Sequence, residues 1–232
     1  MIRVIAVDGP AASGKSSTAS AVARRLGFFH IDSGALYRGV TSVALGLSED
    51  ASADDILTAA EFRGLGFRVM GEAAVLYIDG SPFGARIRDQ EVTAGVSAVS
   101  AIPEVRRWVN RSLRGIATSD RTLVVDGRDI GTAVFPDAPV KVFLDAAPEV
   151  RARRRLAQRD ATSGDLETTT IAAEAERLRK RDEADASRAL DPLRPAEDAT
   201  RIDTANLTFD QQVGVILDLI RRSPLHPGPS AG

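Results

Sequence analysis

Four short runs rich in apolar residues, each followed by turn residues, stand out along the chain. The first run, IRVIAV, is rich in β-branched residues and almost wholly apolar, which is typical of a strand buried on both faces of a parallel sheet. We expect one strand from each run. The runs cover residues 2–7, 28–32, 122–126 and 140–145, and the more polar segment TRIDT at 200–204 is a fifth candidate strand.

Amphipathic segments lie between the apolar runs. After the first run, apolar residues recur at helical spacing, and Gly27 stands where a glycine can end the helix. Thr208 and Gln211 have the spacing of a capping box at the start of a last helix. The apolar stripes of these two helices are Ala19, Val22, Ala23 and Leu26, and Val213, Ile216, Leu217 and Ile220. Strands that alternate with helices predict a doubly wound α/β fold around a five-stranded parallel sheet.

Two stretches depart from this alternation. Residues 62–88 contain several glycines, short apolar runs and the hairpin dipeptide Asp79-Gly80, and they predict a small antiparallel insertion. Residues 148–190 are highly charged, and Pro148 suits the first position of a helix. This second stretch predicts two helices joined by a polar turn at about 161–165.

We expect one folding unit over residues 1–222. Its core would comprise residues 1–32, 116–147 and 196–222. Residues 33–115 would form a second region that carries the insertion, and about 148–190 a helical lid. Residues 223–232 contain three prolines and two glycines, and we expect a disordered tail there.

Composition excludes several classes of function. The 232 residues are 44% hydrophobic and carry a net charge of −2, so no basic field favours a nucleic-acid partner. The chain has no cysteine, which excludes disulfides, thiolate zinc sites and cysteine nucleophiles. No apolar window is long enough to span a membrane. The short first apolar run breaks too early for a secretory signal, so we expect a cytoplasmic protein without a membrane partner.

The turn after the first strand carries the strongest motif in the chain. Its sequence matches the phosphate-binding pattern G-x-x-x-x-G-K-[ST], in which backbone N–H groups and a helix N-terminus cradle phosphates. Lys15 would reach the outer phosphates, and the Ser16 hydroxyl would ligate Mg²⁺. The motif and its neighbour comprise Gly9, Pro10, Ala11, Ala12, Ser13, Gly14, Lys15, Ser16 and Ser17. A turn that binds nothing would give the lysine no reason to stand at the mouth of the helix.

This motif indicates a nucleoside triphosphate but no particular reaction. The chain lacks the N-K-x-D guanine reader of GTPases, and a motor ATPase needs a larger chain and a partner. These exclusions leave the small P-loop kinases, with ATP and Mg²⁺, and the question of which acceptor takes the phosphoryl group.

The segment LVVDGRD supplies candidate residues for the acceptor side. Asp126 falls at the carboxyl end of a strand, where an open α/β sheet collects ligand groups, and would support Mg²⁺ through water. Arg128 and Asp129 follow at once. On this segment alone, Arg128 and Asp129 could also be two solvent-exposed residues of a turn, with no role in binding.

Arginines are concentrated in the charged stretch. Ten occur between residues 151 and 194, with one lysine, and arginine offers a planar fork for phosphate oxygens. A charged helix is often only a solvated face. Two arginine-bearing helices beside a P-loop would instead form a lid that excludes water and supplies positive charge.

At this point four ordered segments resemble bacterial cytidylate kinases. The segments are GPAASGKSS, DSGALYR, DGRDIGTAVFPDAPVKVFLDA and KRDEADASRALDPL, and the resemblance runs from about residue 2 to 222. It implies a P-loop kinase that phosphorylates CMP or dCMP, with the second region binding the monophosphate. It also implies a monomer. The chain has Ser16 and Ser17 where many relatives have glycine and threonine, and Ser16 remains a suitable Mg²⁺ partner.

The resemblance implies roles residue by residue. Those matched to the monophosphate pocket are Ser33, Tyr37 and Arg38, and those matched to the base are Ser97, Arg106 and Asp129. The residues matched to the phosphate groups are Arg128, Arg181 and Arg188. Together with Lys15, these three arginines would be the catalytic residues. Asp185 matches a ribose contact, and Arg154 or Arg155 matches a lid arginine near the triphosphate.

The chemistry of cytosine agrees with two of these roles. Asp129 would accept a hydrogen bond from the exocyclic amino group, and Arg106 would donate to the ring acceptors. Uracil would face Asp129 with an oxygen, which disfavours UMP. Without the resemblance, Ser97 and Arg106 would read only as part of a helix over about 91–115.

Two other functions remain open on the sequence. One is a P-loop kinase for another small acceptor, such as UMP or a sugar acid. The other is a nucleotide-dependent binding module, which would not need a second phosphate pocket. The stretch DSGALYR would then be only a strand end, a turn and a helix start.

Overall fold

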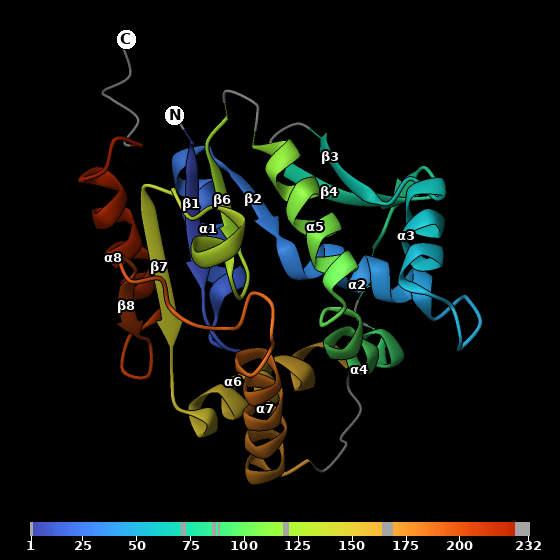
Figure 1. The fold of residues 1–232 in the computed structure, drawn as a ribbon. Helices are drawn as coiled ribbons and strands as arrows, with labels where there is room; N and C mark the ends of the chain where they lie inside the picture. The colour runs from blue at the N-terminus through green and yellow to red at the C-terminus, as the bar shows by residue number, and fades with distance from the viewer. Residues whose placement is uncertain are drawn as a thin grey trace.

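The structure is a computed structural model that describes residues 2–70, 73–84, 87, 89–117, 121–163 and 169–225. Its main sheet has five parallel strands, as the sequence predicts, and their order is β2-β6-β1-β7-β8. The strands are β1 (Val4–Asp8), β2 (Phe29–Asp32), β6 (Leu123–Asp126), β7 (Val140–Asp145) and β8 (Thr200–Asp203). Helices cover both faces of this sheet (Figure 1).

The helices of the described residues are α1 (Lys15–Leu26), α2 (Ser33–Ala44), α3 (Ala53–Phe62), α4 (Gln90–Val99), α5 (Pro103–Ile116), α6 (Pro148–Ser163), α7 (Ile171–Ala186) and α8 (Phe209–Arg221). A short π-helix, η2 (Ile130–Val134), follows β6 and was not expected from the sequence. Two of the expected caps are present. Gly27 ends α1 with φ +64°, and Thr208 forms a capping box with Gln211 at the start of α8.

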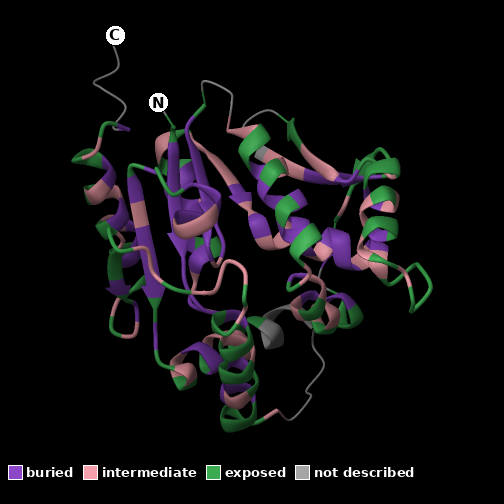
Figure 2. Ribbon diagram, in the orientation of Figure 1, coloured by how far each residue is buried: buried purple, intermediate pink, exposed green. Residues whose placement is uncertain are grey.

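The central strand β1 is buried throughout, and its side chains alternate between two cores. Val4 and Ala6 pack on the side of α2 and α5, whereas Ile5 and Val7 pack on the side of α1 and α8. Figure 2 shows this buried sheet between helices whose outer faces are exposed. The double burial explains why the first run of the sequence is almost wholly apolar.

The antiparallel insertion is present. It consists of β3 (Gly66–Met70), β4 (Ala73–Ile78) and β5 (Ser81–Pro82). Asp79 and Gly80 both have positive φ, +52° and +73°, as a tight hairpin turn requires. Residues 71, 72, 85, 86 and 88 of this expected insertion lie outside the described residues.

Two expected boundaries were wrong. The helix predicted over 91–115 is two helices, because the chain turns after Val99 and Pro103 starts α5 as its first residue. In the charged stretch, Pro148 begins α6 as expected, but α6 continues to Ser163 and takes in the first part of the predicted turn. Residues 164 and 165 of that turn, and 226–232 of the predicted tail, lie outside the described residues.

The helices α6 and α7 pack side by side beyond the carboxyl ends of the strands (Figure 1). Every strand of a parallel sheet ends on this edge, so the loops after β1 and β6 open toward the helical pair. Among the described helices, none is long and apolar enough to cross a membrane.

Candidate active site

The loop after β1 has the conformation of an anion-binding loop. Gly9 has φ +148°, and a Cβ there would lie 2.1 Å from the carbonyl oxygen of Leu144 on β7. Glycine therefore allows the close approach of the two strands. Gly14 caps α1 with φ +90°, so the N-terminus of α1 opens on the carboxyl edge of the sheet. Backbone N–H groups at such a terminus stabilise an anion.

The side chain of Lys15 is buried and folds back over this loop. Its Nζ donates to the carbonyl oxygen of Pro10 at 2.5 Å and to Ser13 Oγ at 3.3 Å. Burial, and then the guanidinium of Arg128, hold the pKa of Lys15 well below its usual value. Both hydrogen bonds are to neutral oxygens. A phosphate oxygen arriving at the loop would offer the ammonium a stronger, charged acceptor.

Two oxygen ligands suited to Mg²⁺ meet beside the loop. The Ser16 hydroxyl donates to Asp126 Oδ2 at 2.5 Å, because β6 ends next to β1. The other carboxylate oxygen lies 2.7 Å from Nε2 of His30, on β2. A hydroxyl and a carboxylate are hard oxygen donors, so the pair fits the preference of Mg²⁺. The sequence indicated Ser16 and Asp126, but His30 was missed.

The start of α2 presents polar groups at the carboxyl end of β2, next to the carboxyl end of β6. Asp32 caps the helix by accepting from Ala35 N at 3.1 Å, and it also accepts from Arg38 Nη2 at 2.7 Å. Ser33 is buried and donates to the carbonyl oxygen of Asp126 at 2.7 Å. The stretch DSGALYR therefore forms a capped helix start, with Arg38 held over the same edge as the P-loop.

Tyr37 lies deeper on α2. Its ring is buried beside the guanidinium of Arg106, whose Cζ is 5.5 Å from the ring centre. Burial, and then the carboxylate of Asp129, raise the pKa of Tyr37. The hydroxyl has no hydrogen-bond partner among the described residues. A buried hydroxyl without a partner is unfavourable, so it marks a position where a bound molecule would supply one.

Arg106 and Asp129 form a buried ion pair beside the ring of Tyr37. Arg106 is 1% exposed, and its Nη2 donates to Asp129 Oδ2. Its Nη1 donates to the carbonyl oxygen of Ser100 at 3.2 Å. Burial raises the pKa of Asp129, and the charge of Arg106 opposes that rise. The structure thus brings together two of the three residues that the resemblance assigned to the base.

The third of these residues, Ser97, contributes differently. It is partly buried on α4, and its carbonyl oxygen accepts from the hydroxyl of Ser100 at 3.1 Å. The serine that contacts the arginines is Ser100, whose Oγ accepts from Arg188 Nη2 at 3.0 Å. A base contact by Ser97 stays a prediction.

An arginine cluster lies beside this ion pair and consists of Arg38, Arg128, Arg155, Arg181 and Arg188. Arg128 Nε donates to Asp185 Oδ2 at 3.0 Å, and Arg188 donates to the other oxygen of Asp185. Burial lowers the pKa of Arg181 to about 10, and the nearby guanidinium of Arg128 adds to this effect. Arg38 and Arg155 lower the pKa of Arg181 in the same way. Groups that disfavour one another's charge in this manner create a strongly positive site, which an anion would stabilise.

The two candidate lid arginines have different surroundings. Arg154 reaches the loop after β8, where its Nη1 donates to Thr204 Oγ1 at 2.9 Å and its Nη2 to Thr204 O at 2.5 Å. Arg155 pairs with Glu174 of α7 at 3.0 Å and lies close enough to Arg181 to affect its pKa. Arg155 therefore belongs to the arginine cluster, whereas Arg154 contacts the edge of the main sheet.

Sequence reasoning missed two links that hold the site together. Asp8 is buried and accepts from the backbone N–H groups of Ile130 and Gly131 at 2.8 and 2.7 Å, which fixes the turn after Asp129. Burial raises the pKa of Asp8 to about 7. Its place at a strand end was a usable signal, the same one that indicated Asp126.

The second link joins α6 and α7 to the P-loop. Asp182 accepts from Ala11 N at 2.9 Å, and Arg151 donates to Ala11 O at 2.8 Å and to Asp182 at 2.6 Å. Asp182 and Ala11 are 171 positions apart, so no spacing in the sequence could indicate this contact.

A P-loop with a Mg²⁺-suited pair of oxygens, beside a second site rich in arginine, defines a P-loop phosphotransferase acting on a small acceptor. A family model described as "Cytidylate kinase" matches residues 5–222. The chain is 42% identical to a cytidylate kinase of Streptomyces avermitilis, covering 94% of this chain and 92% of that protein. It is 41% identical to one of Mycobacterium avium, covering 94% and 95%.

The chain belongs to the cytidylate kinase family, and it is a nucleoside monophosphate kinase. A solved shikimate kinase from Bacteroides thetaiotaomicron is more distant, at 15% identity and a TM-score of 0.46, covering 94% of this chain and 98% of that chain.

Proposed function

We propose that this protein transfers the γ-phosphoryl group of ATP to CMP or dCMP, giving ADP and CDP or dCDP. The observation that carries the proposal is the buried Arg106–Asp129 pair, which stands beside the arginine cluster. A nucleotide whose base is held by this pair would place its 5′-phosphate near Arg128 and Arg181. The acceptor phosphate would then face the P-loop.

The pair suits cytosine in particular. Cytosine offers an amino donor at N4 and acceptors at N3 and O2, so it would donate to Asp129 and accept from Arg106. Uracil would place its O4 against the Asp129 carboxylate, and two buried acceptors would face each other. A lost hydrogen bond to a charged group costs about 1.5–3 kcal/mol, which is enough for strong preference.

Catalysis would rest on positioning and charge. Lys15 would bind the outer phosphate oxygens of ATP. Arg128, Arg181 and Arg188 would stabilise the negative charge on the transferring and acceptor phosphates. Ser16, and Asp126 through a water, would hold Mg²⁺, which neutralises charge on the β- and γ-phosphates when bound. No covalent enzyme intermediate is needed, because the two phosphates would meet in line.

The surrounding regions would divide the remaining tasks. Residues 33–115 would bind the monophosphate, and residues 148–190 would close over the phosphates. Asp185, which holds Arg128 and Arg188, would also reach the ribose. The contact of Arg154 or Arg155 with ATP, the monomeric state and the cytoplasmic location remain predictions.

A panel of acceptors tests the proposal directly. ADP release would be followed with ATP and Mg²⁺ in the presence of CMP, dCMP, UMP, AMP, GMP, shikimate or gluconate. We expect release with CMP and dCMP to exceed that with every other acceptor by at least about tenfold, the effect of one buried hydrogen bond to a charged group. A preference for UMP or a sugar acid would overturn the assignment, and tight ATP binding without acceptor-dependent release would indicate a binding module.

Replacement of Tyr37 by phenylalanine separates binding from stability. The hydroxyl has no partner among the described residues, so its removal should stabilise the free protein, by about 1 kcal/mol. The KM for CMP should rise, while the KM for ATP stays unchanged. Thermal denaturation and initial rates measure the two effects. A less stable variant with an unchanged KM for CMP would remove Tyr37 from the substrate pocket.

A further inference from the structure

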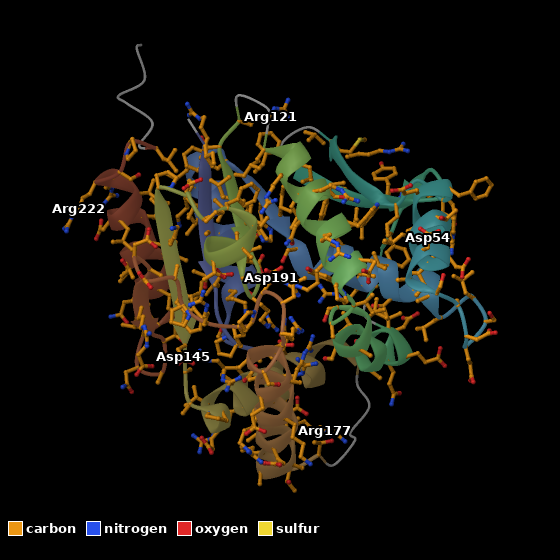
Figure 3. The ribbon with its side chains drawn as sticks, viewed as in Figure 1. Asp54, Arg121, Asp145, Arg177, Asp191 and Arg222 are labelled. Carbon is orange, nitrogen blue, oxygen red and sulfur yellow. The ribbon has the colours of Figure 1, made fainter. Side chains whose placement is uncertain are left out.

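Asp191 lies on the loop that follows α7, near the middle of the molecule in the view of Figure 3. Its Oδ2 accepts from Arg106 Nε at 3.1 Å and from Asn110 Nδ2 at 3.2 Å. Arg106 and Asn110 are one turn apart on the same face of α5. Asp191 has φ +49°, a left-handed conformation that few residues other than glycine, asparagine and aspartate adopt readily. The loop therefore makes a left-handed turn at the residue that delivers this carboxylate to α5, and aspartate is one of the few residues that suit such a turn.

The contacts of Arg106 show what this carboxylate does. Among the described residues, Asp191 takes the Nε–H, Asp129 takes one N–H of Nη2, and Ser100 O takes one N–H of Nη1. A guanidinium has five N–H groups. One donor on each terminal nitrogen therefore remains for a bound base. Contacts at Nε and at both terminal nitrogens fix the plane of the guanidinium, and with it the direction of the two remaining donors.

The same loop connects this contact to the phosphate site. Asp191 comes three residues after Arg188 of the arginine cluster and six after Asp185, which accepts from Arg128 and Arg188. The N–H of Leu193 donates to the carbonyl oxygen of Asp185 at 2.9 Å, which closes the loop on itself. A lid loop that is correctly placed for the phosphates therefore also carries Asp191 to Arg106.

We propose that Asp191 is a positioning residue for base selection: it orients the Arg106 guanidinium so that the two remaining donors meet N3 and O2 of cytosine. Asn110 holds the Asp191 carboxylate in place from the next turn of α5. The inference rests on the proposed function and adds to it a specificity residue contributed by the loop after α7. A purely structural alternative gives Asp191 the single task of anchoring this loop to α5.

Three variants test the inference. Asp191→Gly removes the carboxylate and tolerates the positive φ, and Asp191→Asn keeps an acceptor oxygen without its charge. Asp198→Asn is the matched control, because Asp198 stands in the same segment and pairs with Lys141 at 2.8 Å, away from the base pocket. Initial rates with CMP and with UMP, and thermal denaturation, are measured for each protein.

For Asp191→Gly we expect the KM for CMP to rise about tenfold and the ratio of kcat/KM for CMP over UMP to fall about tenfold. The kcat with CMP and the KM for ATP should change less than about twofold. For Asp191→Asn the same ratio should fall by about threefold, and for Asp198→Asn it should not change. A graded fall of the CMP-to-UMP ratio in this order is not expected if Asp191 only anchors the loop. Loss of an anchor would lower stability and would affect kcat/KM for CMP and UMP equally.

An unchanged CMP-to-UMP ratio in both Asp191 variants would overturn the inference, even if their melting temperatures fall. Should Asp191→Gly fail to fold, Asp191→Asn decides alone, with a threefold fall supporting the inference and an unchanged ratio contradicting it. A wild-type protein without CMP-dependent ADP release would overturn the proposed function instead, so the two failures are distinguishable.

Discussion

Replacement of Lys15 by alanine is expected to lower kcat by about a hundredfold to a thousandfold, the range found when one preorganised electrostatic group is removed from a transition state. Lys15 Nζ lies over the P-loop, 2.5 Å from Pro10 O, within a buried site where charge interactions are strong. No second lysine lies on this loop. The expected loss therefore falls on the transition state rather than on the fold.

Replacement of Lys15 by a longer apolar residue separates the effect of the lost charge from the effect of lost packing. Lys15→Met keeps the apolar stem in the buried site and removes the ammonium. Because burial lowers the pKa of Lys15, the folded state disfavours its charged form. Both variants should therefore melt at or above the wild-type temperature. Steady-state ADP release gives kcat, and thermal denaturation gives stability. Near-normal kcat in a folded variant of either kind would show that the P-loop assignment is wrong.

The second large effect is expected at Asp129. Replacement by alanine should reduce the preference for CMP over UMP, as the ratio of kcat/KM, by about tenfold to a hundredfold. The reason is that the only carboxylate proposed to accept from the cytosine amino group is removed. Uracil would no longer face a buried acceptor, so part of the change should come from improved use of UMP.

The ion pair with Arg106 complicates the alanine variant. Removal of one partner from a buried pair is strongly destabilising, although Asp191 remains beside the guanidinium. Asp129→Asn keeps the volume and can turn its amide to donate to O4 of uracil, so it should shift the preference in the same direction with a smaller loss of stability. The KM for ATP serves as the internal control. If the CMP-to-UMP ratio is unchanged in both variants, Asp129 does not read the base.

The sequence was sufficient wherever the structure is local. The P-loop is eight consecutive residues whose backbone forms the site, and the caps at Gly27 and Thr208 each depend on neighbours within one turn. The same holds for the Asp79-Gly80 hairpin. Asp126 could be found because a simple rule applies to it, since the carboxyl ends of parallel strands face the ligand.

The sequence failed where a residue acts through a distant partner. Arg106 reads only as one more charged residue on an amphipathic helix. Nothing in its neighbourhood indicates that it is the largest fully buried side chain among the described residues. The base contact proposed for Arg106 rests on the family resemblance. The break before Pro103 was also missed, although proline at the first helical position is a usable signal.

The sequence by itself determined the parallel α/β core, the phosphate-binding loop, the charged helical stretch rich in arginine and, through resemblance, the family. Each of these is encoded in adjacent residues or in a periodic pattern, because backbone geometry links near neighbours directly. Only the tertiary structure decided that Asp8 fixes the turn after Asp129, that His30 holds Asp126, and that Asp191 holds Arg106 across 85 positions. Such contacts are set by how the elements pack, since burial of an ionic group requires a partner but leaves open which part of the chain supplies it.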